Sequence, residues 1–236
     1  MTPSARSLLR MAQHRPWPVP RRPWVTRQAW HDVLFAHWPV HPRALHKRIP
    51  PELELDTCDN FAWIGVVAFE ITGARLRAVP LVPGVSRFLQ VNVRTYVRGG
   101  GRPGVYFFSL DASSLAAVRA ARWALRLPYV HAAMSFERQD GRLYLRSRRE
   151  SAAVHAQIDV GYGPAGPAAQ AEPGTLDHFL VERYCLFARD QRRWLHNLEI
   201  HHNTLVESLD LTTPMRTPLL HYAARQDMLA WWPRAL

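Results

Sequence analysis

The clearest pattern in the chain is a strict alternation of polar and apolar residues over residues 88–98. Successive side chains of a strand point to opposite faces, so same-face neighbours lie about 7 Å apart. One face of this strand carries Gln90, Asn92, Arg94 and Tyr96. A solvated sheet face usually carries Lys, Glu, Thr and Gln, whereas arginine beside asparagine and tyrosine is a combination that binds a carboxylate or other planar anion. The row therefore predicts a strand that lines a binding site.

A glycine- and proline-rich turn at residues 99–104 predicts that the chain returns as a strand over residues 105–112. Opposed residues of an antiparallel pair have a constant index sum, and a register that matches polar with polar residues is favoured. That register pairs Arg94 with Ser109, Asn92 with Asp111 and Tyr96 with Phe107. We therefore expect Ser109 and Asp111 to share a wall with the polar row.

The next predicted hairpin carries Tyr129 at its start, which extends this wall if the two hairpins adjoin. A plainer interpretation of the same pattern is a solvated sheet face, because antiparallel sheets commonly expose one side. Arg94 and Asp111 would then form only a cross-strand ion pair, worth a fraction of a kcal/mol.

A helix is predicted over residues 27–37, because Thr26 is a suitable N-cap and apolar residues then recur at helical spacing until Pro39. Those residues are Trp30, Val33, Leu34 and Trp38. Further helices are predicted over residues 42–48, 113–126 and 177–182. The stretch 163–174, rich in Pro, Ala and Gly, predicts a long loop.

Alternating or continuous apolar runs bounded by turn residues predict the remaining strands. They cover residues 52–70, 129–138, 143–149, 151–162, 184–188 and 198–202, and the first of them is apolar on both faces. A helical entry, a long β-rich body and interspersed helices predict an α+β fold with a mainly antiparallel sheet that can close into a barrel.

Composition suits one domain with a substantial core, since 47% of the 236 residues are hydrophobic. Residues 1–23 are rich in proline and contain five arginines and no acidic residue, so we expect a basic arm that is disordered or lies along the surface of a single domain over residues 24–236. That arm supplies five of the eleven excess positive charges. The moderately basic remainder has no recognised nucleic-acid-binding motif, so nucleic acid is not an expected partner.

The longest apolar run, residues 61–69, is far shorter than the roughly 20 residues that a membrane-spanning helix needs. No secretory signal is evident at the N-terminus, and the two cysteines, Cys58 and Cys185, have no partner at CxxC spacing. We therefore expect a cytoplasmic protein that does not associate with membranes and has reduced thiols.

Three side chains are candidates for acid or base chemistry: Asp111, Glu182 and His202. Because His201 and His202 are adjacent on a predicted strand, at most one of them faces a given pocket. There is no HExxH motif or Cys/His pairing, so no metal is expected, and no nucleophile-elbow, dinucleotide-binding or P-loop motif occurs that would indicate a cofactor.

Several motifs, in order along residues 24–211, resemble the YqjF-like family of unknown function. They are Phe35-Ala36-His37-Trp38-Pro39-Val40, Leu53-Glu54-Leu55-Asp56-Thr57, Asn92-Val93-Arg94-Thr95-Tyr96-Val97, the segment from Gly104 to Ala112, Leu127-Pro128-Tyr129 and Glu182-Arg183-Tyr184. That family is similar to the acetoacetate decarboxylase-like superfamily. The resemblance implies a β-barrel or cone around a small-molecule cavity.

Decarboxylases of that superfamily use a desolvated lysine as a Schiff-base nucleophile. The only lysine here is Lys47, on a polar predicted helix, so the resemblance does not carry this chemistry over. Gln90 stands where the family usually has glutamate, and Asn203 to Val206 stand where it usually has Pro-Trp-Pro-Leu.

We therefore expect a cavity protein that binds a small organic anion or carbonyl compound through Asn92, Arg94, Tyr96, Ser109 and Tyr129, like a lyase or decarboxylase without the Schiff-base lysine. The alternatives are a scaffold in which the polar cluster only stabilises the barrel, and a basic nucleic-acid-binding module. The residues decide neither whether the protein is an enzyme nor its oligomeric state.

Overall fold

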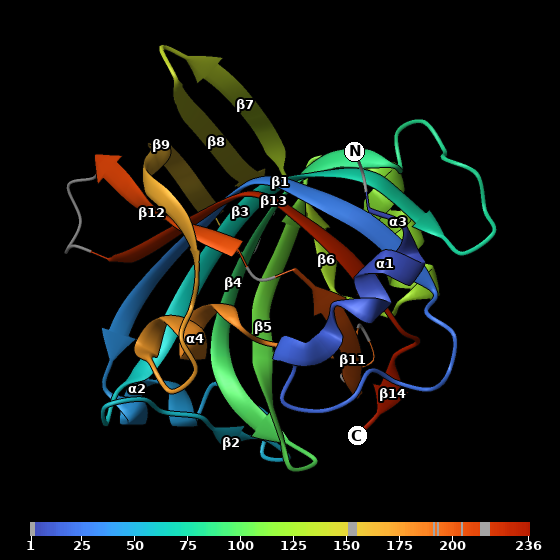
Figure 1. The fold of residues 1–236 in the computed structure, drawn as a ribbon, viewed down its shortest axis with the longest axis vertical. Coiled ribbons are helices and arrows are strands. Elements are labelled where there is room, and N and C mark those ends of the chain that lie inside the picture. Colours follow the sequence, from blue (N-terminus) through green and yellow to red (C-terminus); the bar gives the residue numbers. More distant parts are fainter. Residues whose placement is uncertain (1–2, 151–154, 191, 193, 204, 213–217) are drawn as a thin grey trace.

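The strands of this protein form a closed ring (Figure 1). The computed structural model describes residues 3–150, 155–190, 192, 194–203, 205–212 and 218–236. Round the ring run β11 (Leu195–His202), β10 (Cys185–Arg189), β5 (Arg102–Ala112), β4 (Arg87–Gly99), β3 (Ala62–Leu76), β1 (Thr26–Val40) and β13 (Leu219–Ala230). The ring closes where β13 pairs with β11, from Ile200 opposite Ala230 to His202 opposite Met228. The predicted α+β class with a mainly antiparallel, barrel-like sheet is confirmed.

The sheet continues beyond the ring from β13 and packs against its outside. This extension consists of β12 (Leu205–Thr212), β9 (His155–Gln170), β8 (Arg142–Glu150) and β7 (Ala133–Gln139). The other elements are α1 (Ala5–Arg10), the 3-10 helix Ala12–His14, α2 (Pro42–His46), β2 (Glu54–Leu55), α3 (Leu115–Ala124), β6 (Tyr129–His131), α4 (Leu176–Val181) and β14 (Arg234–Ala235). Three of the predicted helices are thus confirmed as α2, α3 and α4.

Strand β3 lies between two hydrophobic clusters. Val67 and Phe69 point into the ring and join the main core, whereas Ala68 points outward to a cluster that includes Leu143 and Leu145 of β8. The prediction that this segment is buried on both faces is confirmed. It also explains the continuous apolar run, since neither face of the strand meets water.

The helix predicted over residues 27–37 is wrong, because this segment is the long strand β1. Its pairing with β3 shifts register between His31 and Leu34, where Asp32 adopts a φ of 51°. The extra residue reverses which side chains face inward: Trp30 points into the ring before the bulge, and Val33 and Phe35 do so after it. Apolar residues at positions 30, 33 and 34 therefore imitate helical spacing.

The long loop predicted over residues 163–174 is also wrong over its first part, because β9 extends to Gln170. Up to Tyr162, β9 pairs with β8 on one side, whereas from Gly163 onward it pairs only with β12. Proline is tolerated on a strand edge because its missing N–H is not required there. Pro164 and Pro167 therefore mark an edge rather than a loop.

The N-terminal arm is more ordered than its proline content suggests. Its first part forms α1, and Leu8 is 1% exposed in a cluster with Leu229 and Trp231. The arm thus packs against the domain of residues 24–236 through buried contacts. The division at residue 24 stays a prediction, which truncation of the arm would test.

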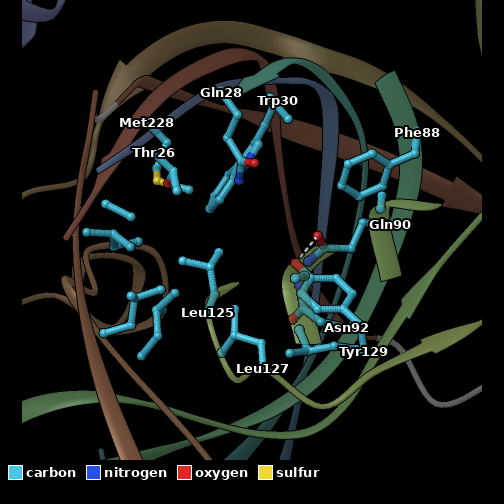
Figure 2. Close-up of a pocket in the computed structure, with 18 of the residues that line it drawn as sticks. Thr26, Gln28, Trp30, Phe88, Gln90, Asn92, Leu125, Leu127, Tyr129 and Met228 are labelled. Atoms are coloured by element: carbon cyan, nitrogen blue, oxygen red, sulfur yellow. Dashed lines mark hydrogen bonds between the residues drawn. The ribbon is translucent and has the colours of Figure 1, made fainter. Parts of the chain in front are cut away.

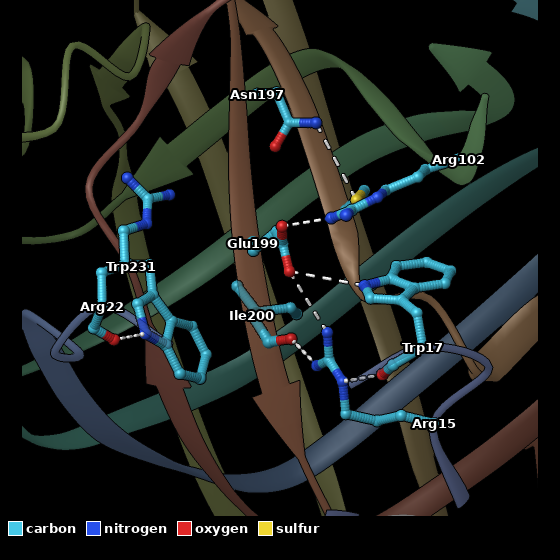
Figure 3. A network of polar contacts seen from close by, with 9 residues as sticks. Arg15, Trp17, Arg22, Arg102, Asn197, Glu199, Ile200 and Trp231 are labelled. Carbon is cyan, nitrogen blue, oxygen red and sulfur yellow. Dashed lines mark hydrogen bonds and ion pairs between the residues drawn. The ribbon is translucent and has the colours of Figure 1, made fainter. Parts of the chain in front are cut away.

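Polar contacts also hold the arm against the outer face of β11 (Figure 3). Arg15 and Trp17 both reach Glu199 Oε2, at 3.4 Å in each case, and Arg102 of β5 binds the other carboxylate oxygen. The Arg15 guanidinium also donates to the carbonyl oxygen of Ile200. Because Ile200 and His202 face the interior from the same strand, the arm supports one wall of the ring.

Leu8→Ala is expected to destabilise the protein by about 3 kcal/mol, because it leaves a cavity beneath α1. For a chain of this length that corresponds to a melting temperature lower by roughly 6 to 12 °C. Leu115→Ala is the matched control, since Leu115 is 48% exposed and should change stability by less than about 0.5 kcal/mol. Equal melting temperatures for the two variants would show that the arm adds nothing to the core.

Candidate functional site

A cavity of about 340 Å³ occupies the interior of the ring (Figure 2). All seven strands of the ring contribute to its walls, and one end is covered by α3 and by the loop over residues 77–86. Figure 2 shows Gln90, Asn92 and Tyr129 together on one wall, across the cavity from Thr26 and Met228. The lining is mostly apolar, so the cavity is not polar-lined throughout as expected. Polar side chains lie along β4 and at the buried end, and others line it from β1, β3 and β13: Thr26, Gln28, Arg75 and Gln226.

The polar row of β4 points into this cavity. Gln90, Asn92 and Arg94 are buried and line it, and Tyr96 lies one step further along the strand, fully buried. A solvated sheet face, the plainer interpretation of the alternation, is therefore wrong. Enclosure removes these groups from bulk water, so their hydrogen-bonding needs must be met within the protein or by a ligand.

Arg94 is the charged group of this row. Its Nη2 donates to the carbonyl oxygen of Leu180 at 3.3 Å, and the Tyr96 hydroxyl donates to the same oxygen at 2.8 Å. Arg94 Nε is buried and has no hydrogen-bond partner among the described residues, nor does any carboxylate of that part of the chain lie within ion-pair distance. The guanidinium also lies over the rings of Phe35 and Tyr96. Its charge is thus held by dipoles and rings rather than by an anion.

A glycine makes room for Arg94. Gly65 of β3 sits between His37 on β1 and Arg94 on β4 in the strand register. A Cβ at Gly65 would lie 3.0 Å from His37 Cδ2 and 3.3 Å from Arg94 Cγ, tighter than ordinary packing. Burial, with smaller contributions from Arg94 and His221, lowers the pKa of His37 well below its usual value. His37 is therefore a neutral neighbour of the guanidinium.

The second guanidinium at the cavity differs from Arg94 because it is paired. Arg183 Nη1 lies 2.8 Å from Asp56 Oδ2, and its Nε donates to the carbonyl oxygen of Phe179 at 2.7 Å. Asp56 also accepts from Arg98 at 3.0 Å, on the solvent side. The charge of Arg183 is compensated, so the buried end of the cavity retains the positive charge of Arg94.

Two amides complete the β4 wall. The Tyr129 hydroxyl donates to Gln90 Oε1 at 2.7 Å, and burial raises the pKa of that phenol, which keeps it protonated as a donor. Asn92 Oδ1 is buried and has no partner among the described residues. A bound molecule that carries both a hydrogen-bond donor and an acceptor would satisfy Asn92 Oδ1 and the neighbouring Arg94 Nε.

The predicted register of the β4–β5 hairpin is wrong, which removes Ser109 and Asp111 from this wall. Arg94 is opposite Phe107, and after a register shift Ser109 is opposite Val93 and Asp111 opposite Val91. Opposed residues share a face, so both polar side chains point out of the ring. Asp111 there forms a bidentate ion pair with Arg149 of β8. The bulge, which index counting cannot anticipate, moves two predicted site residues to the other face.

The remaining acid–base candidates, Glu182 and His202, occupy different positions. Glu182 accepts a hydrogen bond from the Tyr184 hydroxyl and does not line the cavity, and burial raises the pKa of its carboxyl. His202 lines the cavity, whereas His201 points outward and contacts His14 and the Leu8 carbonyl of the arm. The inference that only one of the two histidines faces the pocket is confirmed. Burial lowers the pKa of His202 to about 4, so its imidazole is neutral at pH 7.

Sequence reasoning missed several lining residues for identifiable reasons. Gln28 and Trp30 lie on β1, whose inward face was hidden by the helical interpretation, and Gln226 lies on β13, which carried no clear pattern. Arg183 stands in a recognised motif, but nothing in the motif shows which way its side chain points. Lys47, the only lysine, is exposed at the end of α2 and does not line the cavity.

In the described part of the chain, no cluster of three His, Cys, Asp or Glu side chains could hold a metal ion. No helix there is long and apolar enough to cross a membrane.

The ring of strands places this protein among the acetoacetate decarboxylase-like folds. An acetoacetate decarboxylase-like enzyme from Sphingomonas wittichii RW1 matches with a TM-score of 0.60 and 12% identity, covering 94% of this chain and 97% of that one. The enduracididine biosynthesis enzyme MppR complexed with pyruvate matches with a TM-score of 0.60 and 13% identity, covering 93% of each chain. At these identities the likeness shows the fold alone.

The chain belongs to the DUF2071 family of uncharacterised conserved proteins, whose sequence profile matches residues 27–227. It is 41% identical over 230 residues to the uncharacterised protein YqjF of Bacillus subtilis (strain 168), covering 90% of this chain and 93% of that one. The resemblance stated from the motifs is confirmed. Residues 1–26, which include the arm, lie outside the matched region.

The depressed pKa of His202 predicts a loss of stability in acid. In the unfolded chain the imidazole binds a proton below about pH 6.5, whereas in the folded protein it does so only below about pH 4. The unfolded state therefore binds more protons between these values, and the free energy of unfolding falls as pH drops through this window, by up to about 1.4 kcal/mol per pH unit for this group. Urea unfolding at pH 7, 6 and 5 measures the slope.

His202→Gln is expected to reduce that slope, because glutamine does not titrate, while His37 and His201, whose pKa values burial also lowers, keep part of it. His131→Gln is the control for the substitution itself, since His131 is exposed. An unaltered slope in His202→Gln would mean that His202 already carries its charge in the folded state.

Proposed function

We propose that the cavity binds a small organic anion or carbonyl compound, with Arg94 as the contact for its negative charge or carbonyl oxygen. Asn92 orients the molecule, Tyr96 fixes Arg94 through their shared acceptor at Leu180, and Tyr129 fixes Gln90. Ser109 and Asp111 have no part in it because they lie on the outer face.

The observation that carries the proposal is the environment of Arg94. A buried guanidinium that lacks a carboxylate partner is costly, whereas its paired neighbour Arg183 shows how the same fold compensates such a charge structurally. Charge-assisted hydrogen bonds to a ligand anion would offset that cost. A cavity of about 340 Å³ beside the group falls within the usual range for small-molecule sites.

Two further observations bear on chemistry. The MppR structure with pyruvate is an example of the same fold holding a small keto acid. Here the lysine that would form a Schiff base is missing from the cavity, and among the three acid–base candidates His202 is the one that lines it.

Arg94→Met tests the proposal, because methionine keeps the aliphatic bulk and removes the charge. We expect affinity for carboxylates to fall by about 10- to 100-fold, the contribution of a hydrogen bond to a charged group. The melting temperature should stay level or rise, since a buried charge held for function commonly reduces stability. Calorimetric titration with a panel of monocarboxylates and keto acids, together with thermal melts, measures both quantities.

Asp111→Asn is the contrasting variant. It breaks the outer ion pair with Arg149 and should lower stability by roughly 2 to 3 kcal/mol, somewhat less than a fully buried pair, without changing ligand affinity. A strongly destabilised Arg94→Met variant with unchanged ligand affinity would favour the scaffold interpretation, in which the polar cluster only stabilises the ring.

Lys47 is expected to have no covalent role, because it is exposed at the end of α2, where nothing desolvates its amine. Borohydride reduction in the presence of acetoacetate or pyruvate should therefore leave the mass of the protein unchanged. Stoichiometric labelling of Lys47 that is lost in Lys47→Arg would contradict this expectation.

A further inference from the structure

Strand β4 shows how the character of the cavity changes with depth. Its lining side chains run from Phe88 through Gln90 and Asn92 to Arg94. Phe88 and Arg94 are six residue steps apart on the strand, a distance of about 20 Å at the usual rise per residue. The cavity is therefore long rather than round, with an aromatic ring at one end of this wall and a guanidinium at the other.

The Phe88 end is the mouth. The N-terminus of α3 lies beside it, since Ser113 Oγ and the Leu89 N–H are hydrogen bonded at 2.9 Å. Lining residues of this end are exposed, with Val79 at 41%, Val82 at 44% and Trp123 at 85%. Arg94, by contrast, is 7% exposed and lies at the closed end.

The wall around the mouth is mostly apolar, with Thr26, Gln28 and the exposed Arg75 as its polar members. It is formed by α3, the segment that follows it and the loop after β3, and the side chains include Leu76, Val82, Ala121, Leu125 and Leu127. Burying such surface against a ligand is favourable by about 25 cal/mol per Å². A molecule that reached only Arg94 would leave this apolar surface uncovered.

The closed end carries a single uncompensated charge. Arg183 is neutralised by Asp56, while the histidines nearest Arg94, His37 and His202, are neutral because burial lowers their pKa values. One positive charge matches one carboxylate. A second carboxylate close to the first, or against the apolar wall, would be costly, whereas one that reached the open mouth would meet water and the exposed Arg75.

The volume agrees with a ligand larger than a short keto acid. An engineered apolar cavity of about 150 Å³ holds one benzene ring. The cavity here, at about 340 Å³, has room for a carboxylate and a chain or ring of several further carbons.

We infer that the ligand is an amphipathic monocarboxylate, whose carboxylate binds Arg94 at the closed end and whose apolar tail of about six to ten carbons lies against the apolar wall toward Phe88 and α3. The inference rests on the proposed function and deepens it. On this inference, the apolar half of the cavity is what makes this protein prefer longer carboxylates to anions of the size of pyruvate.

Calorimetric titration of the full chain with acetate, butanoate, hexanoate and octanoate tests the tail. Each methylene that becomes buried should tighten binding by roughly fourfold. Octanamide is the matched probe for charge: it removes the only charge of octanoate and should bind at least about tenfold more weakly.

Two variants of α3 locate the tail. Ala121 lines the cavity, and Ala121→Phe should fill the tail region and weaken octanoate binding by about tenfold or more while leaving acetate binding unchanged. Ala116→Phe is the same change on the exposed side of the same helix and should alter neither. The chain-length series uses the unmodified protein, so it decides the question even if Ala121→Phe does not fold.

The outcomes separate the two proposals. Affinity that does not grow with chain length, or octanoate binding that Ala121→Phe leaves intact, would overturn the amphipathic ligand while Arg94-dependent binding of short anions still supported the proposed function. If no carboxylate of any length bound, or if Arg94→Met bound them as tightly as the unmodified protein, the proposed function itself would fail, and the inference with it.

Discussion

The short pairing between β11 and β13 is the contact on which the rest of the site depends. It turns an open sheet into a ring, and it does so with only three opposed residue pairs. The same stretch places His202 and Met228 in the cavity wall. Because so little of this seam is backbone pairing, support from outside matters, and the arm provides it by binding Glu199 and the Ile200 carbonyl from the outer face. Closure, wall and arm form one structural unit.

Enclosure in turn gives Arg94 its character. An arginine on an open sheet would be hydrated, whereas within the ring its guanidinium donates to the Leu180 carbonyl oxygen, lies over two aromatic rings and has no carboxylate partner among the described residues. The paired Arg183 nearby shows that the fold can neutralise a buried cation when the role is structural. The contrast between the two arginines is a stronger guide to function than either group alone.

The comparison with acetoacetate decarboxylase-like structures illustrates how a fold and its chemistry separate. The fold is common to proteins about 12% identical, so it is set by strand order and burial rather than by particular side chains. The group that reacts is a local feature. This chain has its single lysine at the surface, and Gln90, hydrogen bonded to Tyr129, on the cavity wall.

Features that depend on residues close together in the chain could be predicted from the sequence: the α+β class, helices α2, α3 and α4, and the polar face of β4. Capping residues and strict alternation act over short distances, so the sequence records them directly. The family motifs added the closed cavity. Only the tertiary structure decided what depends on partners far along the chain. The bulge at Asp32 made β1 imitate a helix, edge pairing kept the prolines of β9 within a strand, and a register shift turned Asp111 away from Arg94. A bulge changes which face every later residue occupies, and no local pattern records it.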